Sequence, residues 1–210
     1  MRKVTIGLLL AFMSVVNVYA AKVVAYLQVT EWTPVSVVND VQFDKITDIV
    51  YSFGTLDAWG NVSIVNTAVL TRLVTEANAN AVLVHLAVGG AGQSSNFGSV
   101  IQTQAKMNTF ATSCYTLINQ YGLAGVDIDW EFPASWQANG MATLCSTVKA
   151  KIGTKELSMA VAPIQYNSDG INASAINAVD FINLMAYDDD RGGNHSSYSL
   201  AQESINYWTI

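Results

Sequence analysis

Charge is scarce in this chain of 210 residues. Only 12% of the residues are charged, whereas soluble proteins average roughly 25%, and 51% are hydrophobic. This composition excludes a charged disordered tail. The 10 lysines and arginines are outnumbered by 16 acidic residues, so the chain lacks the basic stripe that binds a phosphate backbone or an anionic membrane surface. We therefore expect a neutral substrate and no nucleic-acid partner.

Cysteine, histidine and proline are also few. Two cysteines, Cys114 and Cys145, exclude a disulfide-dense miniprotein and a four-cysteine zinc site. They either form a disulfide or remain buried free thiols, and the sequence favours neither alternative. The two histidines, His85 and His195, give little basis for a catalytic metal, and we expect none. With three prolines and no proline-rich linker, the chain is expected to form one domain.

The first twenty residues have the pattern of a secretory signal peptide. Arg2 and Lys3 are followed by an uncharged run over residues 4–21, and small residues lead up to Ala20. We expect cleavage after Ala20, secretion to the extracellular space or a periplasm, and no membrane attachment afterwards. An uncleaved anchor is the alternative, because the uncharged run is nearly long enough to span a bilayer.

From residue 22 onward, short apolar segments alternate with longer segments of helical periodicity. This alternation predicts an α/β fold with a parallel sheet covered by helices. The strands are expected at 22–28, 46–54, 81–90, 123–131, 156–163 and 181–188, and the clearest helices at 67–78, 104–121 and 136–151. Phosphate-binding glycine motifs are missing, and polar residues gather at the carboxyl ends of the strands. Both features favour a (β/α)8 barrel over an open doubly wound sheet.

One predicted strand carries three acidic residues at alternate positions. Asp127, Asp129 and Glu131 share one face of a strand, because side chains at i, i+2 and i+4 point the same way. Barrel interiors are normally filled by aliphatic side chains, and burying acids there costs several kcal/mol each. Such an arrangement forces the pKa values of the acids apart and suggests acid–base chemistry.

Three motifs resemble those of family 18 chitinases. Residues 125–133, GVDIDWEFP, are similar to the strand-four signature D-G-x-D-x-D-x-E of that family. Residues 87–90, AVGG, are similar to its strand-three motif S-x-G-G, and residues 185–188, MAYD, to its strand-six motif M-x-Y-D. The motifs occur in the family's order and spacing, and the resemblance extends from about residue 22 to the end of the chain.

The resemblance implies retaining hydrolysis of β-1,4-linked N-acetylglucosamine polymers by substrate-assisted catalysis, without a metal or cofactor. Glu131 would be the general acid and then the base. Asp129 would orient and stabilise the substrate's 2-acetamido group, and Asp127 would share a proton with Asp129. Tyr187 would donate a hydrogen bond to the acetamido carbonyl. The partner would be chitin or a chitooligosaccharide, and we expect a monomer.

Substrate-binding candidates follow the predicted strands. Sugar rings stack on aromatic faces, and core packing is the alternative role for each aromatic side chain. The candidates are Tyr26, Trp32, Phe53 and Trp136, together with Gln165 and Tyr166 for sugar hydroxyls, Met185 for the sugar pocket, and Asp188 by its match to the family motif. His85 is expected inside the barrel as a core residue.

The sequence departs from the family pattern in three ways. Ala124 replaces the first Asp of the carboxylate signature, and Ala87 replaces the Ser of the strand-three motif. We therefore expect the base of the pocket to be repacked with apolar side chains. Only about six βα units are present, so we expect residues 21–210 to form an incomplete barrel and the chain to be a fragment.

Two other functions remain open at this point. An endo-β-N-acetylglucosaminidase acting on N-glycans would use the same three acids. A non-catalytic chitin-binding protein would fit Ala87, Ala124 and the missing strands, although such a protein has no need of a buried acid at Glu131.

Overall fold

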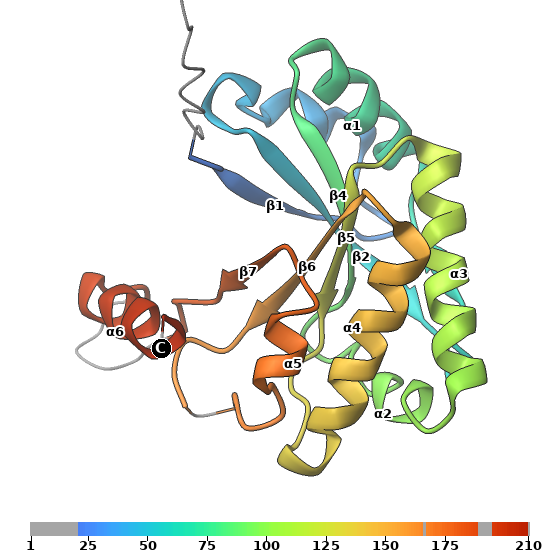
Figure 1. The fold of residues 1–210 in the computed structure, drawn as a ribbon. Helices are drawn as coiled ribbons and strands as arrows, with labels where there is room; N and C mark the ends of the chain where they lie inside the picture. Colours follow the sequence, from blue (N-terminus) through green and yellow to red (C-terminus); the bar gives the residue numbers. More distant parts are fainter. Residues whose placement is uncertain (1–20, 166, 189–194, 210) are drawn as a thin grey trace, which may run out of the picture.

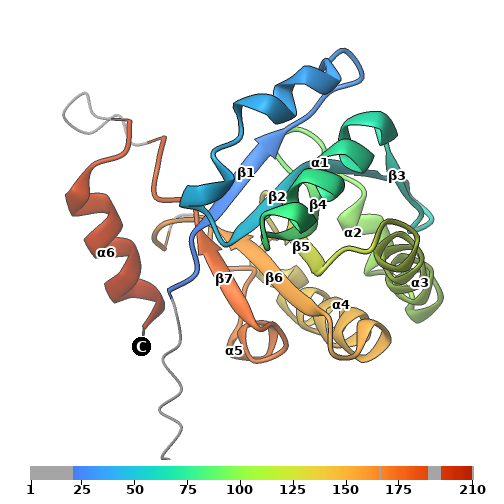
Figure 2. The same cartoon turned by 90° about the horizontal axis from the view of Figure 1, so that it is seen from above.

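The computed structural model describes residues 21–165, 167–188 and 195–209. The predicted signal peptide (residues 1–20) and Tyr166 lie outside the described residues. Six parallel strands are confirmed, in the spatial order β1-β2-β4-β5-β6-β7. Their bounds are Val24–Gln28 (β1), Asp48–Leu56 (β2), Leu83–Gly89 (β4), Gly125–Asp129 (β5), Glu156–Val161 (β6) and Phe181–Leu184 (β7). The sheet curves into part of a barrel (Figures 1 and 2).

The helices lie mainly on the outer face of the curved sheet (Figure 1). The three expected helices are present, and α3 and α4 pack against each other. The α-helices are Thr67–Ala79 (α1), Phe97–Val100 (α2), Gln104–Tyr121 (α3), Ala138–Ile152 (α4), Ala173–Ile176 (α5) and Tyr198–Trp208 (α6), and the 3-10 helices are Val35–Asp40 (η1), Phe43–Lys45 (η2) and Ser135–Gln137 (η3). None of the described helices is long and apolar enough to cross a membrane.

Local signals explain where the helices begin and end. The Asn66 side chain accepts a hydrogen bond from the Val69 amide at the start of α1, and Thr103 accepts one from Lys106 at the start of α3. These are typical N-caps, because a short polar side chain satisfies an amide that lacks a helical partner. Helix α3 ends at Gly122, whose φ of 69° is the left-handed conformation that glycine adopts without strain.

The hydrophobic core lies between the sheet and these helices. In β5, Val126 and Ile128 are fully buried on the helix side, and Trp130 stacks on Phe97 with ring centroids 5.3 Å apart. Cys114 and Cys145 are buried free thiols on α3 and α4, so the disulfide alternative does not hold here. The outer face of β5 is thus apolar, and its acidic residues lie on the opposite face, toward the barrel interior.

One strand was not expected from the sequence. Strand β3, Val62–Ile64, pairs antiparallel with the end of β2 and forms a hairpin. Among the described residues, β1 and β7 are the two end strands of the sheet and do not pair with each other. The sheet is therefore not closed by backbone pairing between these two strands in the described part of the chain.

Candidate active site

The carboxylate strand lies inside the barrel, as its alternation predicts. Asp127 is fully buried, Asp129 is 4% exposed, and Glu131 follows the carboxyl end of β5 in a half-buried position. Side chains from the opposite and neighbouring strands reach Asp127, which confirms that it faces the interior. The three acids rise from the middle of the barrel to its mouth.

Asp127 is held by three hydrogen-bond donors from three strands. The Tyr26 hydroxyl of β1 donates to Oδ2 at 2.9 Å. The Ser158 hydroxyl of β6 and the Asn183 amide of β7 both donate to Oδ1, at 2.5 Å and 3.1 Å. The expectation of an apolar pocket base is therefore wrong, because β6 and β7 supply polar groups that Ala87 of β4 does not.

Asp129 has a different environment. Its Oδ1 is buried and has no hydrogen-bond partner among the described residues, and its carboxyl group shares a hydrogen bond with Glu131. Burial, followed by the charges of Asp127 and Glu131, raises the pKa of Asp129 to about 8. Burial also raises the pKa of Glu131. At neutral pH, one proton is therefore retained between Asp129 and Glu131.

The Glu131 backbone is fixed by a buried serine. Ser94, which is 4% exposed, accepts a hydrogen bond from the Glu131 amide at 3.0 Å. Its hydroxyl lies 2.9 Å from the Gly90 carbonyl and 3.1 Å from the Asp129 carbonyl, either of which accepts its proton. The loop after β4 thus holds the end of β5. The sequence gives no signal that singles out Ser94 for this role.

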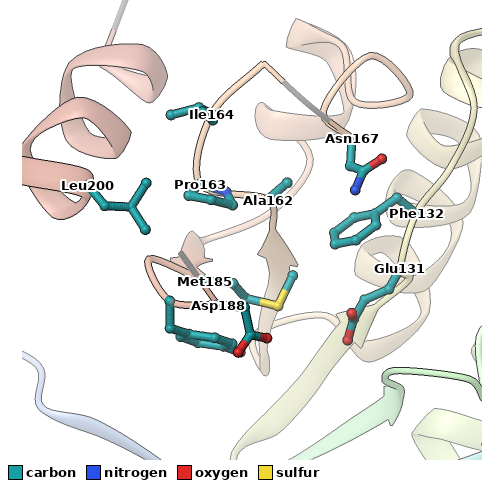
Figure 3. Close-up of a pocket in the computed structure, with 10 residues that line it drawn as sticks. Glu131, Phe132, Ala162, Pro163, Ile164, Asn167, Met185, Asp188 and Leu200 are labelled. Carbon is teal, nitrogen blue, oxygen red and sulfur yellow. The ribbon is translucent and has the colours of Figure 1, made fainter. Parts of the chain in front are cut away.

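A pocket of about 290 Å³ opens beside Glu131. Glu131 and Phe132 lie on one side of it, and Met185, Asp188 and Leu200 on the other (Figure 3). Its remaining lining residues are Ala162, Pro163, Ile164, Asn167 and Tyr187. Burial raises the pKa of Tyr187 to about 12, so its hydroxyl remains a hydrogen-bond donor at neutral pH.

The structure brings only some of the predicted residues together. Tyr187, Met185 and Asp188 line the pocket with Glu131. Tyr26 reaches Asp127 instead, and Phe53 packs against Gly90, where an added Cβ would lie 2.6 Å from its ring. The other candidates are not among the residues that line this pocket: Trp32 is 84% exposed, Trp136 is 78% exposed, and Gln165 is exposed in the loop after β6.

A second polar cluster occupies the amino-terminal end of the sheet. His85 Nε2 lies 2.9 Å from Asp48 Oδ1 and 3.6 Å from Glu156 Oε2. These three residues have the spacing of metal ligands. The Lys22 ammonium, however, lies 3.0 Å from Asp48 and 2.6 Å from Glu156, so the cluster already contains a cation. His85 is buried in the interior, as expected.

Comparison with known proteins agrees with this geometry. Residues 22–209 match the family model of glycosyl hydrolases family 18. Endochitinase 1 of Metarhizium anisopliae is 30% identical over 155 residues, covering 67% of this chain and 36% of the relative. Chitinase 1 of Aphanocladium album is 29% identical over 195 residues, covering 76% and 45%. The chain thus spans less than half the length of these two relatives.

Solved structures show the same fold. The chitinase RmChi1 from Rhizomucor miehei superposes with a TM-score of 0.73 at 22% identity, covering 88% of this chain and 63% of that one. The chitinase domain of the spore coat protein CotE from Clostridium difficile gives a TM-score of 0.75 at 20% identity, covering 94% and 65%.

Proposed function

Because this chain belongs to glycosyl hydrolases family 18, we propose that its barrel hydrolyses β-1,4 bonds between N-acetylglucosamine residues of chitin or chitooligosaccharides. The proposal rests on the placement of Asp127, Asp129 and Glu131 at alternate positions along β5 and just after it. Glu131 lies at the edge of a pocket. The relatives named above carry chitinase names, which supports the substrate class.

In the proposed reaction, Glu131 protonates the glycosidic oxygen as the bond to the leaving sugar breaks. The substrate's own acetamido oxygen attacks the anomeric carbon, so the enzyme needs no separate nucleophile. Asp129 lies next to Glu131 and would stabilise the positive charge that develops on the acetamido group. Glu131, now ionised, then removes a proton from water, which attacks the same carbon and gives retention of configuration.

The pocket supports this assignment of roles. Met185 and Tyr187 line it together with Glu131, and its mixture of apolar and polar side chains suits a neutral acetamido group. The raised pKa values of Asp129 and Glu131 keep a proton available at neutral pH, as a general acid requires.

Replacement of Glu131 by Gln tests the proposal. We expect hydrolysis of a chitooligosaccharide to fall by about 10²–10⁴-fold, the usual contribution of a general acid. Glu76→Gln, on the outer helix α1, is the matched control and should retain wild-type turnover. Proton NMR of the first product should show the β-anomer. Equal turnover in Glu131→Gln and wild type would rule out this general acid.

Two further results would redirect the assignment. Release of sugars from a glycoprotein in preference to chitooligosaccharides would favour an endo-β-N-acetylglucosaminidase. Retention on chitin without turnover would favour a binding protein.

We also propose that the protein is exported after cleavage behind Ala20 and acts as a monomer. The intact mass of the secreted protein tests the cleavage site, and sedimentation tests the oligomeric state.

A further inference from the structure

The polar cluster at the amino-terminal end of the sheet has no part in the proposed reaction. Asp48 of β2, His85 of β4 and Glu156 of β6 each offer one ligand atom, and these atoms lie within 4.8 Å of one another. The His85 Nε2 atom is 2.9 Å from Asp48 Oδ1 and 3.6 Å from Glu156 Oε2. Ligand atoms bound to zinc at about 2.0–2.2 Å in a tetrahedron lie about 3.3–3.6 Å apart, which is close to this spacing.

The sheet register builds the cluster around a glycine. Gly125 of β5 is the register partner of both His85 and Glu156, so it lies between them in the sheet. A Cβ atom at Gly125 would lie 3.0 Å from His85 Nδ1. The position without a side chain therefore leaves room for the imidazole, beside which the Glu156 carboxylate lies.

The hydrogen bonds of two ligands prepare them for a metal. The His85 side chain is 1% exposed, and its Nδ1 has no hydrogen-bond partner among the described residues. When a metal takes Nε2, the ring proton can move to Nδ1 without breaking a hydrogen bond there. The second oxygen of Asp48 accepts a hydrogen bond of 2.6 Å from the Thr47 hydroxyl, and such outer contacts orient metal-binding carboxylates.

The cluster already binds one cation, the Lys22 ammonium. It lies 3.0 Å from Asp48 Oδ1 and 2.6 Å from Glu156 Oε2. A single ammonium balances only one of the two carboxylates, whereas a divalent ion balances both. The Lys22 side chain is 37% exposed, so it can move into solvent and open a path to the three ligands. Lys22 therefore marks the position of a cation and is itself exchangeable.

We propose that Asp48, His85 and Glu156 form a binding site for a divalent transition-metal ion such as zinc, which displaces the Lys22 ammonium. The imidazole ligand favours such an ion over calcium and magnesium, which take oxygen ligands. The bound ion would link β2, β4 and β6 at the end of the sheet away from Glu131. Its role is therefore to stabilise the fold and not to take part in hydrolysis.

Calorimetric titration of the metal-free protein with zinc chloride tests the proposal. We expect one ion per chain, and a melting temperature that rises by about 5–10 °C when free zinc is about 100 times Kd. Calcium chloride under the same conditions should produce no binding signal. A wild-type protein that binds no zinc would overturn the proposal, as would calcium bound with equal affinity.

The two histidines of the chain supply a matched pair of variants. His85→Gln should lose the bound ion. His195→Gln, which changes a side chain that is 73% exposed and lies beside Asp188, should bind zinc as the wild type does. The opposite contrast would place the metal at His195 and overturn the proposed site.

Two further variants decide the proposal if His85→Gln does not fold. Glu156→Gln changes a side chain that is 31% exposed, and it should weaken zinc binding by more than about 10-fold, since even the outer partners of metal ligands contribute this much. Lys22→Met should bind zinc about 10-fold more tightly, because the ion no longer displaces an ammonium. Unchanged affinity in either variant would overturn the proposal. None of these measurements uses a substrate, so the proposed function is decided separately, by turnover in Glu131→Gln.

Discussion

Replacement of Lys22 by Met should destabilise the fold, because it removes the cation from the cluster at the amino-terminal end of the sheet. The Lys22 ammonium, which precedes β1, contacts Asp48 of β2 and Glu156 of β6. It also lies 4.6 Å from the ring centroid of Phe181 on β7. One side chain therefore connects both end regions of the sheet, where no backbone hydrogen bonds join β1 to β7 among the described residues.

The expected loss follows from the exposure of each partner. The Asp48 side chain is 2% exposed, so its hydrogen bond to Lys22 is of the charged, desolvated kind, which contributes about 1.5–3 kcal/mol. The Lys22 side chain is 37% exposed and Asp48 keeps its bonds to Thr47 and His85, which reduces the cost to about 1–2 kcal/mol. For a domain of this size the melting temperature should fall by about 2–8 °C.

Lys45→Met is the matched control. Lys45 also pairs with an aspartate, Asp44, but these side chains are 68% and 69% exposed. Exposed pairs contribute little, so the melting temperature of Lys45→Met should stay within about 2 °C of wild type. Differential scanning calorimetry of both variants measures the contrast. Equal losses would refute the argument that burial of Asp48 sets the energy.

The effect should also depend on pH. Burial alone would raise the pKa of Asp48, but hydrogen bonds from Thr47, Lys22 and His85 outweigh it and hold the pKa below its ordinary value. A carboxyl group with a lowered folded pKa contributes stability above its unfolded pKa near 4, and this contribution is lost as the pH falls through the folded pKa. The difference between wild type and Lys22→Met should therefore be present at pH 7 and shrink in acid.

Three further predictions concern the mouth of the barrel. Asp129→Asn should raise the melting temperature, and the gain should grow from pH 5 to pH 8. The folded pKa of Asp129 is about 8, so ionising this buried carboxyl group destabilises the folded protein as the pH rises. Thermal unfolding at several pH values checks this. Ser94→Ala should cost about 1–3 kcal/mol, measured by urea unfolding, because the Glu131 amide loses its buried acceptor. Trp136→Ala should weaken chitooligosaccharide binding, measured by calorimetry, without lowering stability, whereas Tyr115→Ala on the outer face of α3 should change neither.

The sequence predicts the six parallel strands because each is a short apolar run. Strand β3 could not be found in this way, because a three-residue segment has no measurable periodicity. Its position depends on the preceding turn, in which the Asp57 carboxylate accepts hydrogen bonds from the Trp59 and Asn61 amides. Such a turn is defined by contacts between neighbouring residues and not by a hydrophobic pattern.

The acids of the site are predictable for the same reason, since alternation along one strand places Asp127 and Asp129 on one face. Their partners are not. Ser158 and Asn183 each lie alone in an apolar strand, and only the register of β5 with β6 and of β6 with β7 brings them to Asp127. Register depends on tertiary structure. Ala87, in place of the family's serine, therefore predicts an apolar pocket base, whereas the neighbouring strands supply polar side chains.

The two polar clusters of the sheet differ in the groups that surround their acids. At the amino-terminal end, the Lys22 ammonium pairs with both acids that lie beside it. At the mouth, burial and the charges of Asp127 and Glu131 all raise the pKa of Asp129. Lys22, whose side chain is 37% exposed, pairs with Asp48 and Glu156 and not with the carboxylate strand. Among the described residues, the Asp127 carboxyl group is instead held by hydrogen-bond donors. The raised pKa of Asp129 keeps a proton on a carboxyl group at neutral pH, which a general acid requires.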